Sequence, residues 1–282
     1  MNATPADRQR PIIGFLTDFG LDGAAATCRG VMLSICRDAQ IVDICHTVRK
    51  YAIADAAYLL ISALPYLPIG VHVAVVDPGV GTERRPLALR AGRGDILIGP
   101  DNGLLPPAAD ALGGIAEARV LEDRRWWLAT TTSTFHGRDI FSPVAAHLAV
   151  GHASFADVGP PLPSGEVVRL PAPQAQVSDG VIQTRVRYID SFGNIRLTGT
   201  LPDLVAAFGP MPAETAFEVE IGLAGAARHE TIHFAQTFGG VSVGTALLYI
   251  DSSGDLALAD NQGNAAARLG AQVGQPVRLT RS

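Results

Sequence analysis

Cysteine is scarce in this chain of 282 residues. The three cysteines, Cys28, Cys36 and Cys45, all lie in the first fifth of the sequence, and no two of them have CxxC spacing. An odd number without that spacing argues against a disulfide framework and against a structural zinc site. The pair formed by Cys45 and His46 leaves two interpretations open: half of a metal site, or a buried thiol beside a structural histidine at the end of a strand.

The chain also lacks an excess of positive charge. Lysine and arginine together number 22, and only one of them, Lys50, is a lysine. Aspartate and glutamate number 27, so the formal net charge is −5. Binding of nucleic acid relies on clustered basic side chains, so we expect no nucleic-acid partner. The strong preference for arginine over lysine reflects genome composition and indicates little about function.

Long uninterrupted apolar segments are absent as well. Residues 1–11 are polar and have no apolar core, so we expect no signal peptide. The most apolar stretch, residues 52–76, is interrupted by Asp55, Pro65 and Gly70, which favours a buried helix followed by a buried strand over a membrane span. With 48% apolar and 17% charged residues, the composition is that of a globular protein with a sizeable core. We therefore expect a reduced, cytoplasmic protein with no membrane partner.

Short apolar runs alternate with helical patterns through the first 150 residues. Strands are predicted at 12–16, 41–44, 71–76, 87–90 and 96–99, and helices at 24–37, 52–64 and 140–150. This alternation, with strands that are apolar on both faces, predicts an α/β domain in which helices cover both faces of a layered sheet. We place that domain at residues 11–160.

The pattern changes after residue 150. Five of the nineteen prolines lie between Gly151 and Gln176, which predicts an extended linker at residues 161–176. Beyond the linker, only 203–208 has a helical pattern. Turn residues separate short alternating runs at 177–189, 216–221, 230–234, 245–250, 256–259 and 277–279. This arrangement predicts a small all-β, barrel-like domain at residues 177–282.

The most informative polar residues follow the strand predicted at 71–76. Asp77 ends that strand, a Pro-Gly turn follows, and Arg84 comes seven residues later, in reach of the carboxylate. His136, in the polar cluster 134–139, could join them. One aspartate, one arginine and one histidine without metal-ligand spacing indicate that water or substrate is oriented there. The alternatives are an aspartate bonded to its own turn, a solvated arginine and a structural histidine.

Three further polar segments have two interpretations each. Asp18 ends the first predicted strand, where α/β sheets bind ligands, and its carboxylate could accept from both hydroxyls of a ribose or form an Asx turn. Asp190, Phe192 and Asn194 supply a carboxylate, a ring and an amide, which can bind a cation, stack on a flat ring and read a donor/acceptor edge, or they form a hairpin turn. The segment 251–254 has the composition of a hairpin turn.

Together and in this order, these motifs resemble one family closely. The family is the S-adenosylmethionine (SAM) hydrolases, or SAM hydroxide adenosyltransferases, which are related to the fluorinating and chlorinating SAM enzymes. The similarity extends over residues 11–270, and its most specific segments are 76–82 and 135–139. The segments that carry it are Leu16–Gly20, Val42–His46, Val76–Thr82, Pro100–Gly103, Phe135–Asp139, Asp190–Asn194 and Ser252–Gly254.

The resemblance implies a fold, an assembly and a reaction. It implies an α/β domain followed by a barrel-like domain, a homotrimer, and a substrate held where the first domain of one subunit meets the second domain of its neighbour. Water or hydroxide would displace methionine from the 5′ carbon of the ribose, giving adenosine and L-methionine. Since the sulfonium leaves as a neutral thioether, neither a cofactor nor a metal is expected.

The resemblance also implies a role for each site residue. Asp77, Arg84 and His136 would form the catalytic triad, and Asp18 would hold the ribose hydroxyls. The remaining residues would contact other parts of the substrate: Tyr51 and Phe135 the ribose and the reacting carbon, Asp190 and Ser252 the amino-acid head, and Phe192 and Asn194 the adenine.

Asp77 favours hydrolysis over halogenation. The halogenating relatives have a tyrosine in place of Asp77 and lack the histidine at 136, and a carboxylate would repel a halide. Arg196 stands where the halogenases have a tryptophan, and Ser253, Asp260 and Gln262 also differ from them near the substrate. Two alternatives therefore stand beside the hydrolase: a SAM or adenosine sensor with vestigial activity, and a chloride-using SAM halogenase.

Overall fold

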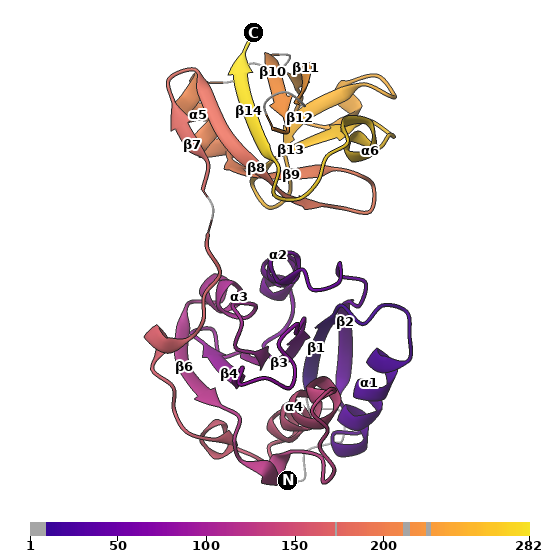
Figure 1. Cartoon of the computed structure of the whole chain (residues 1–282), viewed down its shortest axis with the longest axis vertical. Coiled ribbons are helices and arrows are strands. Elements are labelled where there is room, and N and C mark those ends of the chain that lie inside the picture. The colour runs from indigo at the N-terminus through magenta and orange to yellow at the C-terminus, as the bar shows by residue number, and fades with distance from the viewer. Residues whose placement is uncertain (1–9, 173, 211–214, 224–226) are drawn as a thin grey trace, which may run out of the picture. The chain divides into compact units, whose positions relative to one another are not determined.

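A computed structural model describes residues 10–172, 174–210, 215–223 and 227–282 (Figure 1). The chain divides into two compact units, Met1–Leu170 and Pro171–Ser282. Most of the segment in which we expect no signal peptide lies outside the described residues, as does Pro173 of the expected linker. Among the helices that are described, none is long and apolar enough to cross a membrane.

The first unit contains a six-stranded mixed sheet with the strand order β2-β1-β3-β5-β4-β6. β1, β2, β3 and β5 run parallel, whereas β4 is antiparallel to both β5 and β6. The carboxyl ends of the parallel strands therefore share one edge of the sheet, where an α/β fold collects ligand-binding side chains. The strands are β1 (Ile12–Thr17), β2 (Gln40–Cys45), β3 (Val71–Val75), β4 (Pro86–Ala91), β5 (Ile96–Pro100) and β6 (Ile115–Val120).

Four α-helices accompany this sheet among the described residues of the first unit, and α1 packs beside α4 (Figure 1). The helices are α1 (Ala24–Ile35), α2 (Ile53–Ala63), α3 (Pro106–Ala111) and α4 (Ser142–Val150). A π-helical turn, Gly137–Phe141, leads directly into α4. Short 3₁₀ turns lie at Leu64–Tyr66, Arg124–Trp126, Phe155–Val158 and Ser164–Glu166.

The sheet has an apolar core on each face. Alternate residues of a strand point to opposite faces, so Phe15 and Leu16 of β1 enter different cores. One core joins Leu16 to Leu60 of α2 and to residues of α3. The other joins Phe15 to Met32 of α1 and to residues of α4. Burial on both faces holds the carboxyl ends of β1 and β3 in fixed positions, and the polar residues that follow them are fixed in turn.

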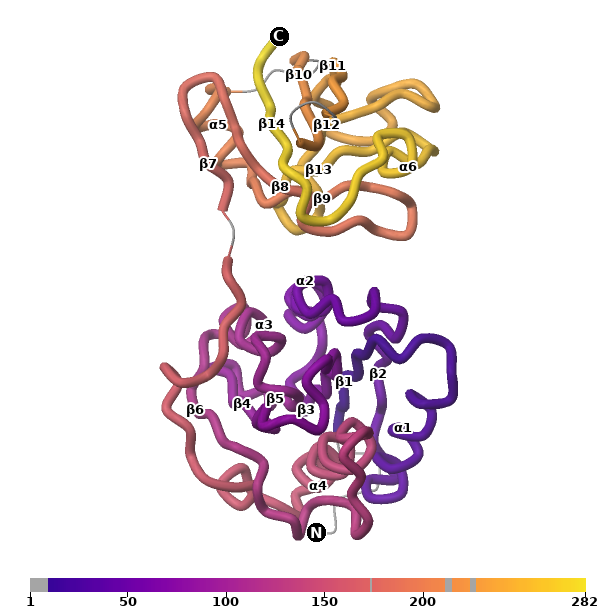
Figure 2. Tube along the Cα trace, in the orientation of Figure 1, coloured from indigo at the N-terminus to yellow at the C-terminus, as the bar shows by residue number. Residues whose placement is uncertain are grey.

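The second unit is a closed seven-stranded β-barrel with β7 added outside it (Figure 2). The strand order is β14-β10-β11-β12-β13-β9-β8-β7, and pairing of β14 with β8 closes the barrel. All neighbours are antiparallel except β11 and β12. The strands are β7 (Gln176–Ser178), β8 (Val181–Ile189), β9 (Ile195–Thr200), β10 (Ala216–Ile221), β11 (Arg228–Phe234), β12 (Ala246–Ile250), β13 (Asp255–Asp260) and β14 (Pro276–Arg281).

Closure removes the exposed strand edges that an open sheet of this length would present. One apolar core fills the barrel and contains residues such as Ile182, Phe217 and Leu258. Two short helices, α5 (Leu201–Phe208) and α6 (Ala265–Leu269), and a 3₁₀ turn at Phe238–Gly240 connect the strands. The prediction of an α/β region followed by a barrel is confirmed at this level of detail.

Several local predictions were incomplete. The run predicted over 177–189 is two strands, because Gly180 takes a left-handed conformation (φ 69°) and turns the chain between β7 and β8. The helix predicted at 140–150 begins earlier, as the π-helical turn at Gly137. Four elements had not been predicted: α3, β6, β9 and α6.

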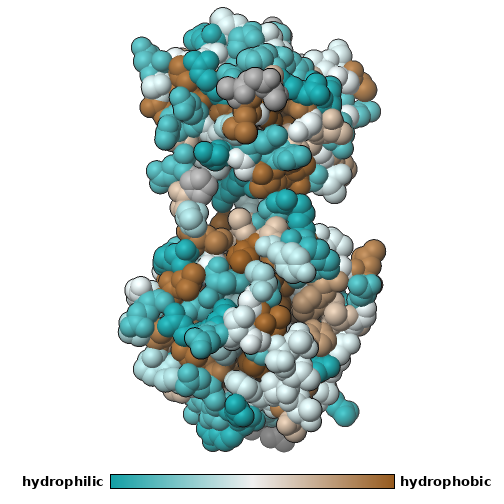
Figure 3. Space-filling view, viewed as in Figure 1, coloured by the Kyte–Doolittle hydropathy of each residue, from teal (hydrophilic) through white to brown (hydrophobic). Residues whose placement is uncertain are grey.

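Apolar side chains that reach the surface are dispersed. On the face seen in Figure 3, brown apolar patches are interrupted by teal polar side chains in both units. The most exposed large apolar residues of the first unit are Leu21, Tyr66, Tyr51 and Ile69, which lie on three connections: before α1, before α2, and between α2 and β3. Single exposed apolar residues of this kind are ordinary and do not define a docking surface.

Candidate active site

The turn after β3 carries the Asp77–Arg84 pair. The hydroxyl of Thr82 donates to the carbonyl of Gly79 (2.7 Å) and so stabilises the reversal of the chain. Arg84 then donates to the Asp77 carboxylate through Nε (3.2 Å to Oδ1) and Nη2 (2.5 Å to Oδ2). The two side chains are only 7% and 5% exposed. The predicted pairing of these two residues is therefore confirmed, in the two-pronged geometry that suits a guanidinium and a carboxylate.

Gly81 allows this turn to pack directly against the segment that precedes His136. Its φ is +79°, and a Cβ placed there would lie 2.5 Å from the carbonyl oxygen of Ser133. Both the left-handed conformation and the close approach require glycine. Gly81 thus brings together two segments that are some fifty residues apart in the sequence.

His136 completes the predicted triad. Nη2 of Arg84 lies 3.1 Å from Nδ1 of His136. A guanidinium only donates hydrogen bonds, so Nδ1 must accept, and the proton of the neutral ring then resides on Nε2. Burial lowers the pKa of His136 from its ordinary value, and the positive charge of Arg84 lowers it further. The ring is consequently neutral at pH 7, with Nε2 available as a donor.

A buried carboxylate, Asp139, fixes the segment that precedes His136. Its Oδ2 accepts from both the backbone N–H and the hydroxyl of Thr132 (2.8 Å each), and Oδ1 accepts from Nε of Arg138 (2.6 Å). Burial alone would raise the pKa of Asp139, but the hydrogen bonds from Arg138 and Thr132 outweigh it and lower the pKa. The Arg138 guanidinium also lies over the ring of Phe135, 5.0 Å from its centroid.

Asp18 and Tyr51 meet beyond the end of β1. Asp18 is 8% exposed, and its Oδ2 accepts from the backbone N–H of Tyr51 (2.9 Å). Tyr51 has a left-handed backbone conformation (φ 64°), which is uncommon for a residue with a side chain, and its side chain is largely exposed. Such strain is usually retained at functional positions.

A cavity of about 180 Å³ in the first unit collects these residues. Five predicted site residues line it: Asp18, Tyr51, Asp77, Phe135 and His136. The structure thus brings together residues from four separate segments of the chain, and Arg84 contacts two of these residues, Asp77 and His136. The residues that complete the lining are Phe19, Val75, Val80, Thr134 and Gly137.

Five of these lining residues had not been predicted as site residues: Phe19, Val75, Val80, Thr134 and Gly137. Each lies within three residues of a predicted site residue, so adjacency to the motifs was the available signal. The rings of Phe19 and Phe135 meet edge to face, with centroids 5.7 Å apart, and form an apolar wall. The cavity therefore combines carboxylates with aromatic rings, a lining suited to a polar sugar and a flat apolar group.

The other predicted site residues lie on turns of the barrel. Asp190, Phe192 and Asn194 form the hairpin turn between β8 and β9, so the hairpin interpretation is correct for the backbone. Oδ1 of Asp190 accepts from the backbone N–H groups of Phe192 (2.9 Å) and Asn194 (3.0 Å), and Oδ2 accepts from Nδ2 of Asn194 (2.9 Å). The Phe192 side chain is 75% exposed.

Ser252 lies on a second turn, between β12 and β13, and is exposed. Asp251 stabilises that turn by accepting from the backbone N–H groups of Ser253 (2.7 Å) and Asp255 (3.0 Å). Arg196 pairs with Asp251, and its Nη2 also lies 3.9 Å from Oδ2 of Asp190. Arg196 thus connects the two turns that carry all four predicted barrel contacts.

Two departures from the halogenases lie near α6. Asp260 accepts from Nη2 of Arg268 (2.6 Å), and Gln262 has a left-handed conformation (φ 56°).

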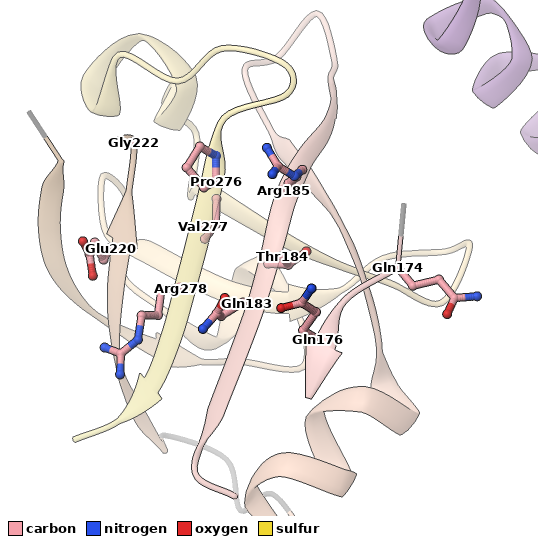
Figure 4. Close-up of a pocket in the computed structure, with 10 residues that line it drawn as sticks. All are labelled: Gln174, Gln176, Gln183, Thr184, Arg185, Glu220, Gly222, Pro276, Val277 and Arg278. Atoms are coloured by element: carbon pink, nitrogen blue, oxygen red, sulfur yellow. The ribbon is translucent and has the colours of Figure 1, made fainter. Parts of the chain in front are cut away.

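The described part of the barrel also has a cavity of about 310 Å³ on its outer wall (Figure 4). Its lining comes from β7, β8, β10 and β14 and from Gln174 and Gly222, and it includes none of the predicted site residues.

The interpretation of Cys45 and His46 as half of a metal site gains no support from their contacts. His46 Nε2 lies 2.9 Å from Oδ1 of Asp43, and Nδ1 lies 2.9 Å from the hydroxyl of Thr17, whereas Cys45 Sγ is next to Thr47. Within the ranges that the structure describes, no group of three or more His, Cys, Asp or Glu residues could hold a metal ion.

Two family models match the chain. The SAM hydroxide adenosyltransferase N-terminal domain matches residues 13–159, and the C-terminal domain of the same family matches residues 184–278. The chain belongs to the SAM hydroxide adenosyltransferase family. The resemblance inferred from the motifs is confirmed.

Relatives and a solved structure agree with this membership of the family. An (R)-S-adenosyl-L-methionine hydrolase from Salinispora tropica is 43% identical over 273 residues, which cover 96% of this chain and 98% of the relative. A fluorinase from Actinopolyspora mzabensis is 31% identical over 306 residues, covering 97% and 98%. The crystal structure of an uncharacterized conserved protein from Thermotoga maritima has a TM-score of 0.87 at 32% identity, covering 95% of this chain and 100% of that one.

Proposed function

We propose that this protein hydrolyses S-adenosyl-L-methionine to adenosine and L-methionine. The observation that carries the proposal is the Asp77 carboxylate on the wall of the cavity, paired with Arg84 and next to a neutral His136. A carboxylate suits the orientation of water and would repel a halide ion. The hydrolase from Salinispora tropica is also more similar to this chain than the fluorinase from Actinopolyspora mzabensis.

In the proposed reaction, a water molecule accepts a hydrogen bond from Nε2 of His136 and donates one to Asp77. Its oxygen attacks the 5′ carbon of the ribose in line with the departing sulfur. The new C–O bond forms as the C–S bond breaks, and the bonding pair leaves with the sulfur as a neutral thioether. The surplus proton passes to Asp77 and then to solvent.

The proton transfer belongs late in this reaction. The pKa of bulk water is about 15.7 and that of an ordinary aspartic acid about 3.9, so deprotonation of water before attack is steeply unfavourable. His136 is a poor acceptor for the proton, because Nδ1 already accepts from Arg84 and Nε2 carries the ring proton. This geometry supports Asp77 as the group that receives the proton.

The same proposal gives roles to the remaining site residues. Asp18 would bind the ribose hydroxyls, with Tyr51 and Phe135 against the sugar. We also propose that the barrel contributes Asp190 and Ser252 to the amino-acid head of the substrate, and Phe192 and Asn194 to the adenine. As the leaving group is neutral, we propose that no metal or cofactor is needed, and activity should survive treatment with a chelator.

The assembly and location are proposals of the same kind. We propose a cytoplasmic homotrimer in which a neighbouring subunit supplies the barrel contacts. The solution mass, measured by light scattering, should then be three times that of one chain. A monomer with full activity would contradict the shared site.

Product analysis tests the function directly. The purified protein is incubated with each sulfonium epimer of SAM, with and without chloride, and the products are separated by chromatography. We expect adenosine and methionine under both salt conditions, and we expect the (R) epimer to be consumed faster, as the names of the relatives suggest. A chlorinated adenosine would favour a halogenase instead. SAM that binds tightly but is not consumed would favour a sensor.

A further inference from the structure

A network of hydrogen bonds joins the turn after β1 to the segment before α2. The backbone N–H of Gly20 donates to the carbonyl of His46 (2.6 Å), and the His46 ring contacts the hydroxyl of Thr17 (2.9 Å). These bonds connect segments that are nearly thirty residues apart. We call residues 17–20 and 46–51 together the Asp18 clamp, because Asp18 lies in the sequence between Thr17 and Gly20, which both contact His46.

Two consecutive residues of the clamp hold Asp18 itself. Nζ of Lys50 donates to the backbone carbonyl of Asp18 (2.5 Å), while the backbone N–H of Tyr51 donates to its carboxylate (2.9 Å). One contact fixes the Asp18 peptide and the other fixes the carboxylate. Rotation of the peptide that follows Asp18 would break the bond to Lys50, so this bond restrains the backbone from which the carboxylate enters the cavity.

Lys50 is also the only lysine of the chain, although the sequence contains many exposed arginines. The composition alone had attributed this imbalance to the genome. A lysine has a compact ammonium group on a flexible stem, which suits contact with a single carbonyl oxygen, whereas an arginine presents a wider planar fork. The single lysine of the chain thus contacts a residue of the cavity.

We propose that Lys50 is a positioning residue for recognition of the ribose. Through its bond to the Asp18 carbonyl, it holds the Asp18 carboxylate and the strained backbone of Tyr51 in the geometry that binds the 2′ and 3′ hydroxyls. This inference rests on the proposed function, since it takes adenosine as the product that occupies the cavity. Lys50 lies outside the cavity lining and acts only through Asp18 and Tyr51.

The test compares two nucleosides that differ only in the ribose hydroxyls. Binding of adenosine and of 2′,3′-dideoxyadenosine is measured by calorimetry for the wild type, Lys50→Met and Lys50→Arg. Methionine keeps the length of the side chain but removes the donor. Arg37→Met is the control for charge, because Arg37 is exposed and lies just before β2, at the sheet edge opposite Asp18.

Lys50→Met should weaken adenosine binding about tenfold, the effect of losing a charged hydrogen bond, and should leave dideoxyadenosine binding unchanged. The KM for SAM should rise by about the same factor at an unchanged kcat, because the contact positions the substrate and takes no part in bond breaking. Lys50→Arg should recover only part of the affinity, because it keeps the charge but its wider fork suits a single carbonyl oxygen less well, and Arg37→Met should behave as the wild type.

The outcomes separate this inference from the proposed function. A wild type that hydrolyses SAM and binds adenosine, with Lys50→Met equal to it, would overturn the role of Lys50 alone. An equal loss of affinity for both nucleosides would also overturn it, because the effect would then be independent of the hydroxyls. A wild type that binds no adenosine and leaves SAM intact would overturn the proposed function and the inference together.

Discussion

The α/β unit and the barrel hold their charged site residues differently. In the α/β unit, Asp77 and Arg84 are more than nine-tenths buried, and His136 contacts the same guanidinium. In the barrel, Ser252 is exposed and Phe192 is 75% exposed. Both carboxylate oxygens of Asp190 accept hydrogen bonds from residues of its own turn. Packing between buried segments fixes the site residues of the α/β unit, whereas the backbone of surface turns fixes those of the barrel.

This difference separates the tasks that we propose for the two units. Bond breaking requires groups held to within a fraction of an ångström, and burial between two packed segments provides such rigidity. Recognition of a base or an amino-acid head depends on a few exposed contacts, each of which contributes modestly. Substitutions of Asp77, Arg84 and His136 should therefore change kcat, and substitutions of the predicted barrel contacts should change affinity.

The largest effect is expected for Asp77→Asn. The amide keeps the shape of the side chain but cannot take a proton from water, so kcat should fall by about 10²- to 10⁴-fold. Binding of adenosine should remain within a few-fold of the wild type, which calorimetry can establish. Turnover equal to that of the wild type would remove Asp77 from the mechanism and end the proposed separation of tasks.

Gly81→Ala tests whether close packing of the segments that carry Asp77 and His136 matters. The added Cβ would lie 2.5 Å from the carbonyl of Ser133, at a φ of +79°. We expect the free energy of unfolding to fall by about 1–3 kcal/mol, and kcat to fall because Asp77 and His136 move apart. Gly165→Ala is the matched control, since nothing lies within 4 Å of its Cβ position. Unchanged kcat in a folded Gly81→Ala variant would show that the site tolerates this displacement.

His136 gives the site a dependence on pH. Its pKa is lowered by burial and by Arg84, so the ring is neutral in the folded protein and gains a proton only in acid. Its contribution to stability is fully present above the unfolded pKa of about 6.5, and is lost as the pH falls through the lowered folded value. Activity should decline over the same range, because a protonated ring cannot accept from Arg84.

His136→Asn should remove this dependence. The amide oxygen can accept from Arg84 at any pH, so the acid limb of kcat/KM should flatten, with a loss of about tenfold at pH 8. Urea unfolding at pH 7.5 and pH 5 should show a larger decrease in stability for the wild type than for the variant. Equal decreases in the two proteins would exclude His136 as the titrating group.

The smallest effect is expected in the barrel. Asn194→Ala should weaken adenosine binding by about three- to tenfold, the contribution of one hydrogen bond, and leave kcat nearly unchanged. Gln176→Ala, in the outer cavity of the barrel, should have no effect and serves as the control. Adenosine affinity equal to that of the wild type in Asn194→Ala would place the adenine elsewhere.

The sequence predicted the long apolar strands well, because periodicity and turn residues agree there. It missed α3 and α6, which have six and five residues and are too short for a clear helical period. It also missed β9, which contains Gly199, because a glycine within a strand weakens the strand pattern. The division of 177–189 depended on a single left-handed glycine, Gly180.

Prediction of the site was limited in a different way. Spacing placed Arg84 in reach of Asp77, but bringing His136 beside them depends on Gly81 and on the buried Asp139, which are tertiary effects. The left-handed conformation of Tyr51 has no signature in the sequence. Lys50 was visible as a unique residue, yet only its contact with Asp18 gives that observation a structural meaning.

Hydrolysis of SAM in water enriched in ¹⁸O tests the central claim most directly. The account predicts adenosine that is 2 Da heavier, with the label in the 5′ hydroxyl, and unlabelled methionine, because water attacks the 5′ carbon. Adenosine without the label, or a label in the methionine fragment, would contradict attack by water at that carbon. No product at all would contradict the proposed activity.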